Sequence, residues 1–499
     1  MNRNQALFLF LALIVSIPFE VASQSNSGYD IVLEGGRVID PETGLDGVRN
    51  VGIMGNRIAD ISQNKMAGKR TINASGLVVS PGFIDLHVHG QTNKAHQYQV
   101  RDGVTTALEL EGGIPFIEHW IDSKRGNSLV NYGASVAHAV LRVLPMVEDI
   151  DIVKALNDSL NANGWSEKLA YQQLDANVEN ANNRSLTETE LKELDGFLKT
   201  ELNNGALGIG IPVGYYPGAT GRELLKVYQI SAKYNAPIFS HTRGFGLPGI
   251  NEAIANATVT GAPLHIVHIN SLSLGEIDVS LDMIASAQAQ GLDITTELYP
   301  YTAASTHIQS VLFDEGWQET LGISYGDLQW EATGERLTES TFKKYRKQGG
   351  VIIIHMMKPE WIEMGIKAPF TIIASDGMAY APGAHPRTAG TFSKVLGQYV
   401  RENNHLSLND ALAKMTIMPA RRLEAISPAM RSKGRLQIGA DADITIFSPE
   451  KIIDKADFSG MKYSEGIEYV LVNGVIVVNS GKSVEGVFPG RPVLGKYKN

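Results

Sequence analysis

The stretch PGFIDLHVHG, residues 81–90, decides how this chain is interpreted. The apolar run at residues 77–83 predicts a β-strand that leads into two histidines one residue apart. Successive side chains of a strand point to opposite faces, so His87 and His89 point the same way. Two imidazoles on one face, at the carboxyl end of a strand, can bind one metal ion. A bare His-x-His pair also occurs without a metal, so the interpretation depends on ligands from later strands.

Length and composition predict a globular protein with a large core and two domains. The chain has 499 residues, of which 43% are hydrophobic and 19% are charged. The net charge of −9, without a basic run, argues against nucleic acid as a partner. The chain contains no cysteine, which excludes disulfides, thiolate metal ligands and a cysteine nucleophile.

Residues 1–23 resemble a secretory signal peptide. Arg3 precedes an apolar run at residues 6–17, and the small residues at 21–23 suit cleavage by a signal peptidase. The alternative is an N-terminal membrane anchor, but a span needs about 20 apolar residues and this run is shorter. We therefore expect a secreted or periplasmic protein whose mature chain has no transmembrane segment.

Both ends of the chain contain short strand-like segments. Residues 29–61 alternate strands with tight turns, and residues 443–447 and 469–478 are strand-like, with an Asn-Gly hairpin turn in the latter. We expect residues 24–80 and 426–499 to form one small β-sandwich domain, with the middle of the chain inserted as another domain.

The middle, residues 81–425, alternates apolar strands with helical stretches, which is typical of a parallel sheet built from βα units. The strand candidates are residues 77–87, 105–111, 132–137, 208–213, 238–241, 264–269, 293–299, 351–355 and 371–374. About eight such units predict an α/β fold of the (β/α)8, TIM-like barrel type. Active-site residues of this fold lie at the carboxyl ends of the strands.

Polar residues at the ends of the next strands are candidate ligands. Glu109 and Glu111 share a face of their strand, and a carboxylate that points into a barrel needs a partner such as a metal. We prefer Glu111 because it lies nearer the strand end, with Glu109 as the alternative. The following candidate, His241, ends an apolar strand.

Two later strands complete the set. His265 and His268 have opposite parity, so only one should face the barrel interior, and His268 lies nearer the strand end. His265 is then expected to be a packed, hydrogen-bonded histidine. Asp376 follows an apolar run directly before a glycine, and beside four histidines it is predicted to be a general base at the metal rather than a helix cap.

Taken in this order, the residues resemble the metal-dependent amidohydrolase superfamily and, within it, the D-aminoacylase (N-acyl-D-amino-acid deacylase) family. The resemblance covers almost all of the mature chain. It rests on the motifs at residues 78–89, 103–106, 130–142, 205–208, 216–218, 299–306, 375–377, 385–387 and 434–443.

The resemblance implies a hydrolase that binds one or two Zn²⁺ ions and cleaves the amide bond of N-acyl amino acids, with the D form expected. The resemblance implies that His87, His89, His241 and His268 bind metal and that Asp376 is the base. With Glu111 and Asp376 added from the strand argument, the predicted metal ligands are His87, His89, Glu111, His241, His268 and Asp376. The implied contacts to a substrate carboxylate are Tyr299, Ser305 and Arg387, while His138 would assist the oxyanion or orient a ligand. The expected partner is therefore a small molecule with a carboxylate.

Three departures from the family pattern affect the substrate more than the chemistry. The usual bridging cysteine would fall near Gly112, so Glu111 or Glu109 must replace it. A usual lysine is Asn270, which removes one cationic contact, and His355 is a possible substrate contact at the end of another strand. The alternatives are hydrolysis of a dipeptide, cyclic imide or lactone, or a non-catalytic binding protein; the oligomeric state is not predicted.

Overall fold

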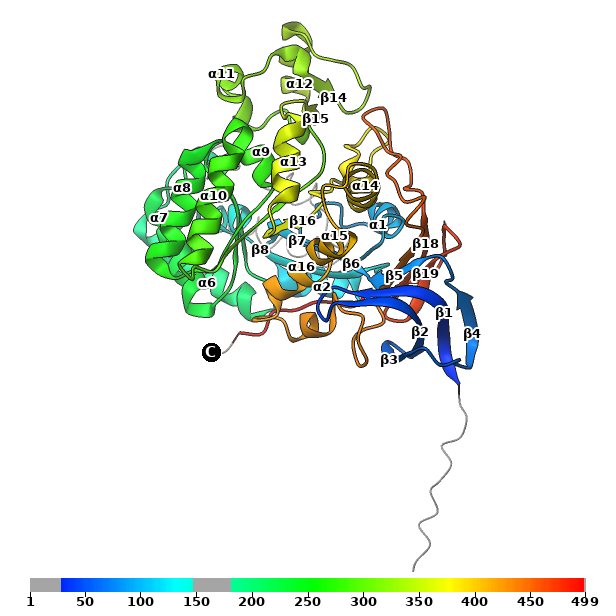
Figure 1. The fold of residues 1–499 in the computed structure, drawn as a ribbon. Coiled ribbons are helices and arrows are strands. Elements are labelled where there is room, and N and C mark those ends of the chain that lie inside the picture. The colour runs from blue at the N-terminus through cyan, green and yellow to red at the C-terminus, as the bar shows by residue number, and fades with distance from the viewer. Residues whose placement is uncertain (1–27, 147–180, 498–499) are drawn as a thin grey trace, which may run out of the picture.

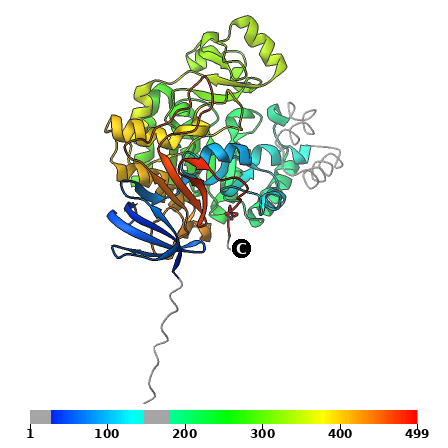
Figure 2. The ribbon, with the colours of Figure 1, turned by 90° about the vertical axis from the view of Figure 1, so that its right-hand side faces the viewer.

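The computed structural model describes residues 28–146 and 181–497. In this part of the chain a barrel lies between a small mixed sheet and an insertion that rises from the barrel (Figures 1 and 2). The predicted signal peptide, residues 1–23, lies outside the described residues. None of the described helices combines the length and apolar character that crossing a membrane requires.

The central element is a parallel sheet of eight strands in the order β16-β12-β11-β10-β9-β8-β7-β6. These strands are β6 (Phe83–Asp85), β7 (Val104–Ile114), β8 (Asn131–Ala137), β9 (Ile209–Pro212), β10 (Ile238–His241), β11 (Leu264–Ile266), β12 (Ile294–Leu298) and β16 (Thr371–Ile373). Loop hydrogen bonds close the seam between β6 and β16: Gly377 N–H donates to the His87 carbonyl (3.2 Å) and His89 N–H to the Gly377 carbonyl (2.8 Å). The predicted TIM-like barrel is confirmed.

Helices surround this sheet, because nearly all residues of its strands are buried and the outer face of the sheet needs cover. They are α1 (Asn93–Val100), α2 (Ile117–Lys124), α3 (His138–Leu141), α6 (Glu188–Asn203), α7 (Gly221–Tyr234), α8 (Leu247–Thr260), α9 (Ile269–Ser273), α10 (Ile277–Ala289), α13 (Pro359–Lys367), α14 (Arg387–Lys394), α15 (Leu408–Met415) and α16 (Ile417–Leu423). Several begin with a hydrogen-bonding cap that the sequence supplies, such as Thr220, whose hydroxyl accepts from Glu223 N–H at the start of α7.

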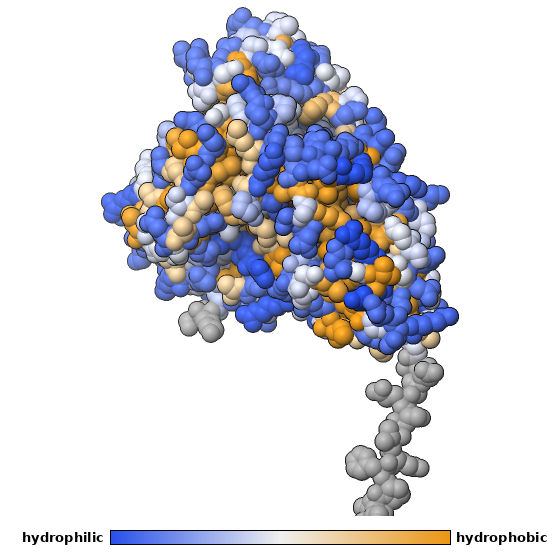
Figure 3. Space-filling view, viewed as in Figure 1, coloured by the Kyte–Doolittle hydropathy of each residue, from blue (hydrophilic) through white to orange (hydrophobic). Residues whose placement is uncertain are grey.

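Strands from both ends of the chain share one mixed sheet, in the order β20-β19-β18-β17-β5-β1-β2-β3 with β4 beside β1. The bounds are β1 (Tyr29–Asp40), β2 (Leu45–Met54), β3 (Arg57–Ser62), β4 (Gly68–Asn73), β5 (Val78–Pro81), β17 (Ile444–Phe447), β18 (Ile467–Val472), β19 (Val475–Asn479) and β20 (Lys482–Ser483). The junction is the antiparallel pair β17–β5, which places Ile444 opposite Pro81. Figure 3 shows hydrophobic residues over the part of this face where the small sheet lies.

The insertion between β12 and β16 corrects one expectation. Residues 351–355 were expected to form a barrel strand, but β15 (Val351–Ile354) lies in a separate sheet of order β13-β15-β14. The other elements of the insertion are β13 (Ala304–His307), α11 (Trp317–Leu321), β14 (Leu328–Trp330) and α12 (Glu339–Gln348). The run Val-Ile-Ile-Ile is as apolar as a barrel strand, so composition alone does not separate the two positions.

The C-terminal segment returns to the opposite end of the barrel from the insertion (Figure 1). Tyr132 N–H, at the start of β8, donates to the Arg491 carbonyl (3.1 Å), and Val493 N–H donates back to the Tyr132 carbonyl (2.7 Å). Gly495 N–H then donates to the Gly205 carbonyl (2.9 Å). The last residues therefore extend the barrel's hydrogen bonding at its amino-terminal edge.

A buried ion cluster connects the small sheet to the barrel. Lys433 Nζ lies 2.9 Å from Asp441 and 2.6 Å from Asp443, and all three side chains are at most 10% exposed. Asp443 also accepts a hydrogen bond from Asn131 Nδ2 on β8 (2.9 Å). Because buried carboxylates need a positive partner, this cluster should stabilise the contact between the two domains.

Replacing Lys433 with Met should destabilise the protein by about 3–5 kcal/mol, because two buried carboxylates lose their counter-charge. Urea unfolding followed by far-UV circular dichroism should show the lower midpoint. Lys69→Met, which removes an exposed partner of Asp30, is the matched control and should leave the midpoint nearly unchanged. An equal midpoint for the two variants would contradict this assignment.

Candidate metal centre

The loop after β6 presents the two histidines of the opening motif. His87 Nε2 lies 3.2 Å from His89 Nε2, and the rings meet edge to face. Asp85 Oδ1 accepts hydrogen bonds from the N–H of His87 (3.2 Å) and from the N–H of Ser375, after β16 (3.0 Å). This carboxylate therefore aligns the loops of the first and last barrel strands at one site.

Glu111, on β7, lies between two pairs of histidines. Its Oε2 is 3.0 Å from His87 Nε2 and 3.2 Å from His89 Nε2. Its Oε1 is 2.8 Å from His241 Nδ1 and 3.2 Å from His268 Nε2. Glu111 thus occupies a bridging position between a first half, His87 with His89, and a second half, His241 with His268.

Glu109, the alternative bridge, has a different position. Its Oε2 lies 2.9 Å from His89 Nδ1, the ring nitrogen opposite the one that faces Glu111. Its Oε1 accepts a hydrogen bond from Gly112 N–H at 3.1 Å. A Cβ at Gly112 would come within 3.3 Å of the same oxygen, so the glycine leaves room for Glu109. The geometry favours Glu111 over Glu109 as the bridging carboxylate.

Asp376 joins the centre from the loop after β16. Its Oδ1 lies 3.5 Å from His87 Nε2 and 3.4 Å from His89 Nε2, and its Oδ2 lies 2.8 Å from Arg387 Nη1. Burial alone would raise the pKa of Asp376, but Arg387 and His87 lower it well below the usual range. The side chain is therefore held as a carboxylate at neutral pH.

Two of these residues have backbone angles that L-residues rarely adopt. His268 has φ of 28° and Asp376 has φ of 51°, and both lie in loops shortly after the ends of barrel strands β11 and β16. Such conformations cost about 1–3 kcal/mol each and persist only where the surroundings hold them. Strain of this kind concentrates at functional sites, which supports a functional role for both residues.

The donor set fits a metal ion. The Nδ1 of His87 faces Glu297 (2.6 Å) and that of His89 faces Glu109, and an ionised carboxylate only accepts hydrogen bonds. Each Nδ1 therefore carries the proton, and the two Nε2 lone pairs point at each other and at Glu111. A metal ion, or protons on these nitrogens, would relieve this repulsion. In each of three overlapping groups of donors, the ligand atoms lie within 4.8 Å of one another. Imidazole and carboxylate donors without sulfur suit Zn²⁺ and similar divalent ions.

The three predicted carboxylate contacts lie together next to Asp376. The Arg387 guanidinium stacks on the Tyr299 ring at 4.7 Å, and its Nη2 donates to the Ser305 backbone carbonyl (3.4 Å). The Tyr299 hydroxyl, the Ser305 hydroxyl and Arg387 Nε are buried and have no hydrogen-bond partner among the described residues. Three unpaired donors beside a cationic group form a receptor for an anion.

Asn270 and His138, also predicted as substrate contacts, have mainly internal partners. Asn270 Nδ2 donates to the Tyr299 carbonyl (3.2 Å), and its buried Oδ1 has no donor among residues 28–146 and 181–497. His138 is fully buried, with Nδ1 at 2.9 Å from the Tyr216 hydroxyl and Nε2 at 3.2 Å from Glu223. The roles assigned to both residues stay predictions.

His355 follows β15 in the insertion. Its Nε2 lies 3.0 Å from Gln329 Oε1, and its ring packs against Phe458 at 4.7 Å. Burial lowers the pKa of His355 to about 4, so the ring is neutral near pH 7. These contacts explain its position without a ligand, and a substrate contact stays a prediction.

The sequence interpretation missed two residues of the site. Glu297, on β12, supports His87, and a carboxylate inside a largely buried strand was a signal for a buried partner. Tyr215 packs on the His241 ring at 4.8 Å and its hydroxyl lies 3.2 Å from the Thr306 hydroxyl. Nothing in the sequence distinguishes Tyr215 from its neighbour Tyr216.

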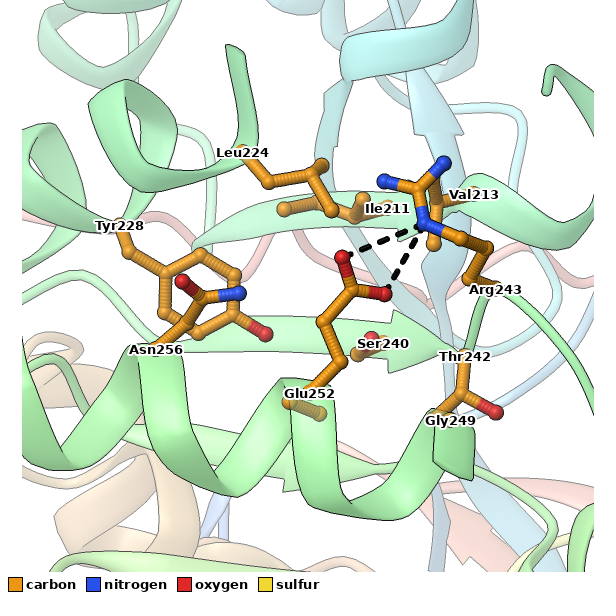
Figure 4. Close-up of a pocket in the computed structure, with 11 residues that line it drawn as sticks. Ile211, Val213, Leu224, Tyr228, Ser240, Thr242, Arg243, Gly249, Glu252 and Asn256 are labelled. Atoms are coloured by element: carbon orange, nitrogen blue, oxygen red, sulfur yellow. Dashed lines mark hydrogen bonds and ion pairs between the residues drawn. The ribbon is translucent and has the colours of Figure 1, made fainter. Parts of the chain in front are cut away.

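A separate small pocket lies between α7, α8 and β10 (Figure 4). Arg243, two residues after His241, pairs there with Glu252 at 3.0 Å and donates to the Ala219 carbonyl (2.8 Å). The charges on these two side chains compensate each other. The pocket contains none of the predicted metal ligands.

Cation binding should strengthen as pH rises. Burial alone would lower the pKa values of His87 and His89, but the surrounding carboxylates raise both well above the usual value. Below these pKa values, protons occupy nitrogens that a metal needs, so affinity is lost as pH falls. Zn²⁺ titration calorimetry in buffers of different ionisation enthalpy should show proton release and about tenfold tighter binding per pH unit for each proton released. Affinity independent of pH would contradict this arrangement.

Comparison with known proteins agrees with this geometry. A family model described as "Amidohydrolase family" matches residues 243–478. The N-acyl-D-glutamate deacylase of Alcaligenes xylosoxydans xylosoxydans is 29% identical over 482 residues, which cover 90% of this chain and 93% of that protein. The D-aminoacylase of the same organism is 28% identical over 479 residues, which cover 91% and 96% of the two chains.

Solved structures show the same fold. The N-acyl-D-glutamate deacylase of Bordetella bronchiseptica, crystallised with zinc and a phosphonate inhibitor, gives a TM-score of 0.77 at 24% identity and covers 94% of this chain and 100% of its own. A D-aminoacylase crystal structure gives the same TM-score at the same identity, covering 93% and 100% of the two chains. The resemblance to the amidohydrolase family that was read from the sequence is therefore confirmed.

Proposed function

We propose that the protein is a zinc-dependent hydrolase that cleaves the amide bond of N-acyl-D-amino acids. The observation that carries the proposal is the anion receptor of Tyr299, Ser305 and Arg387, joined directly to the metal centre through the contact between Arg387 and Asp376. An amino acid carries its carboxylate one carbon from the acylated nitrogen. A receptor beside the metal centre therefore suits this substrate class. Similarity to proteins named N-acyl-D-glutamate deacylase, D-aminoacylase and N-acyl-D-aspartate deacylase supports the same class.

The residues that would hold zinc are His87, His89, Glu111, His241, His268 and Asp376. Bound there, zinc would lower the pKa of water and polarise a carbonyl group. Glu111 would tie the two halves of the centre together through its two oxygens. Glu297 and Glu109 would keep His87 and His89 in the tautomer whose Nε2 faces the centre.

Asp376 is placed to move the proton. Its Oδ1 faces the two histidines of the first half, while Arg387 holds its Oδ2. As general base it would take a proton from the attacking water at Oδ1 and return it to the leaving nitrogen. Arg387 would bind the substrate carboxylate with Tyr299 and Ser305, which fixes the scissile amide relative to Asp376.

Zinc-loaded protein should release amine from N-acetyl-D-amino acids and not from their L enantiomers. Asp376→Asn should lower kcat by about 10²–10⁴-fold, because the amide cannot accept the proton, while zinc content falls by less than half. A ninhydrin-type amine assay, with zinc measured by atomic absorption on the same samples, tests both statements. Retained turnover in this variant would rule out Asp376 as the base.

Arg387→Met should lower kcat/KM for an N-acetyl-D-amino acid by about 100-fold or more, because a charged hydrogen bond to the carboxylate is lost. The corresponding amino-acid amide, which has no carboxylate, should be an equally poor substrate for the variant and for the unmodified protein. Arg125→Met, which removes an exposed guanidinium, is the control and should behave as the unmodified protein does. An equal loss for both substrates would mean that Arg387 acts on Asp376 alone.

The second candidate is hydrolysis of a dipeptide, cyclic imide or lactone. The buried Oδ1 of Asn270 favours this candidate. It is an uncharged acceptor that cannot bind a carboxylate, and it has no donor among the described residues, so it suits a substrate that brings an N–H or O–H group. Similarity to proteins named dihydroorotase points the same way. Zinc bound at full occupancy without amine release from any N-acyl amino acid would select this class.

A further inference from the structure

His385 is a buried histidine beside the anion receptor, and no step of the proposed reaction uses it. It precedes Arg387 by two residues, and its side chain is fully buried. A fully buried ring acts through the groups that it contacts. Both ring nitrogens of His385 have a partner, and the two partners lie on different sides of the receptor.

The first partner is the backbone of Arg387. Its N–H, at the start of α14, donates to His385 Nδ1 at 3.1 Å. The first N–H groups of a helix have no carbonyl partner inside the helix, so another group has to satisfy them where the helix start is buried. His385 therefore fixes where the main chain of Arg387 lies.

The second partner belongs to the insertion. His385 Nε2 lies 2.9 Å from the carbonyl of Ala303, which directly precedes β13. Ser305, two residues further along, has a carbonyl that accepts a hydrogen bond from Arg387 Nη2 (3.4 Å). The contacts therefore form a closed ring, from Arg387 through His385 to the insertion and back to Arg387.

Both hydrogen bonds require the same form of the imidazole. A ring nitrogen that accepts from an N–H carries no proton, and one that bonds to a carbonyl carries a proton. His385 is therefore neutral, with its proton on Nε2. Burial and the neighbouring Arg387 guanidinium hold its pKa well below the usual value, so the ring keeps this form at neutral pH.

Aromatic rings fix the orientation of His385. Phe458 and Tyr301 meet its ring edge to face at 5.2 and 5.6 Å, and Tyr299 does so at 6.2 Å. Phe458 comes from the segment between β17 and β18, whereas Tyr299 is itself part of the receptor. Arg387 and Tyr299 thus contact His385 directly, and Ser305 is joined to it through the two preceding residues.

We propose that His385 is a positioning residue that sets the distance between the barrel side of the anion receptor, Arg387 with Tyr299, and its insertion side, Ser305. The inference rests on the proposed function, because it takes this receptor as the binding site of the substrate carboxylate. An anion held between two elements gains most when their separation is fixed before it binds. Loss of His385 should therefore weaken substrate binding and spare the proton transfer at Asp376.

Two conservative variants separate the two hydrogen bonds. His385→Asn places an acceptor at the position of Nδ1, and His385→Gln places a donor at the position of Nε2, so each keeps one bond and loses the other. Each should raise KM for an N-acetyl-D-amino acid by about tenfold and change kcat by less than about threefold, because a buried group loses its partner while Asp376 keeps its place. The corresponding amino-acid amide should be hydrolysed as by the unmodified protein. His405→Gln, at a histidine 3.4 Å from Glu363, is the matched control and should change neither constant.

Crystal structures of the two variants give a measurement that does not depend on turnover. The contact between Arg387 Nη2 and the Ser305 carbonyl, 3.4 Å in the unmodified protein, should open to about 4 Å or more in both. An unchanged contact in both structures, or the same proportional loss of kcat/KM for the acid and for the amide, overturns the inference. Phe458→Leu loosens the packing of the ring from outside the receptor and should raise KM by about threefold. This variant carries the test if the substitutions at His385 do not fold, and an unchanged KM then overturns the inference.

The same measurements distinguish this inference from the proposed function. Protein that releases no amine, but whose variants show the opened contact, keeps the role of His385 in the receptor geometry and overturns the proposed substrate. Protein that hydrolyses N-acetyl-D-amino acids with the same KM in all variants keeps the proposed function and overturns the inference.

Discussion

The arrangement of the whole metal centre depends on one buried carboxylate. Glu111 lies within hydrogen-bonding distance of four imidazoles that come from three different strand ends or loops. Removing charged groups from water costs several kcal/mol per ion, so such a cluster persists only when a cation compensates it and the donors converge closely. The closed barrel provides this convergence, because its strands all end at the same rim. The seam between β6 and β16, where Gly377 bonds to both His87 and His89, is part of the same requirement.

The residues of the metal centre and those of the proposed anion receptor come from different parts of the chain. The cation-binding residues all belong to barrel strands or to the loops that follow them directly. The three residues of the proposed anion receptor come from both the barrel and the insertion. Arg387 is the first residue of the barrel helix α14 and Tyr299 directly follows β12, whereas Ser305 lies on β13 of the insertion. Under the proposed function, a change in the insertion could therefore alter which acid is bound without moving Glu111 or the histidines. This arrangement agrees with a family in which one metal-binding framework serves several substrates.

Alternation along strands accounts for most of the site residues found from sequence. It paired His87 with His89, and it separated His268, at the metal centre, from His265, which bonds to Glu297 and Thr295. It could not separate Glu109 from Glu111, because residues two apart share a face of the strand, and only the position nearer the strand end favoured Glu111.

The remaining errors have physical causes too. Residues 351–355 have the composition of a buried strand, and only tertiary context placed β15 in the insertion. The role of Glu297 was not predicted, although a charged side chain within a largely buried strand needs a buried partner. The barrel as a whole was predictable because eight apolar strands separated by helices leave few alternatives.

The hydrogen bonds that the last residues make below β8 affect how the protein can form. The small sheet pairs β5 with β17, and Tyr132 bonds to Arg491 and Val493, so neither unit is complete until nearly the whole chain has been made. Contacts this distant in sequence raise the contact order, which slows folding and prolongs the time during which sheet edges are unpaired. A newly made chain should therefore depend on protection from aggregation until its C-terminal residues arrive.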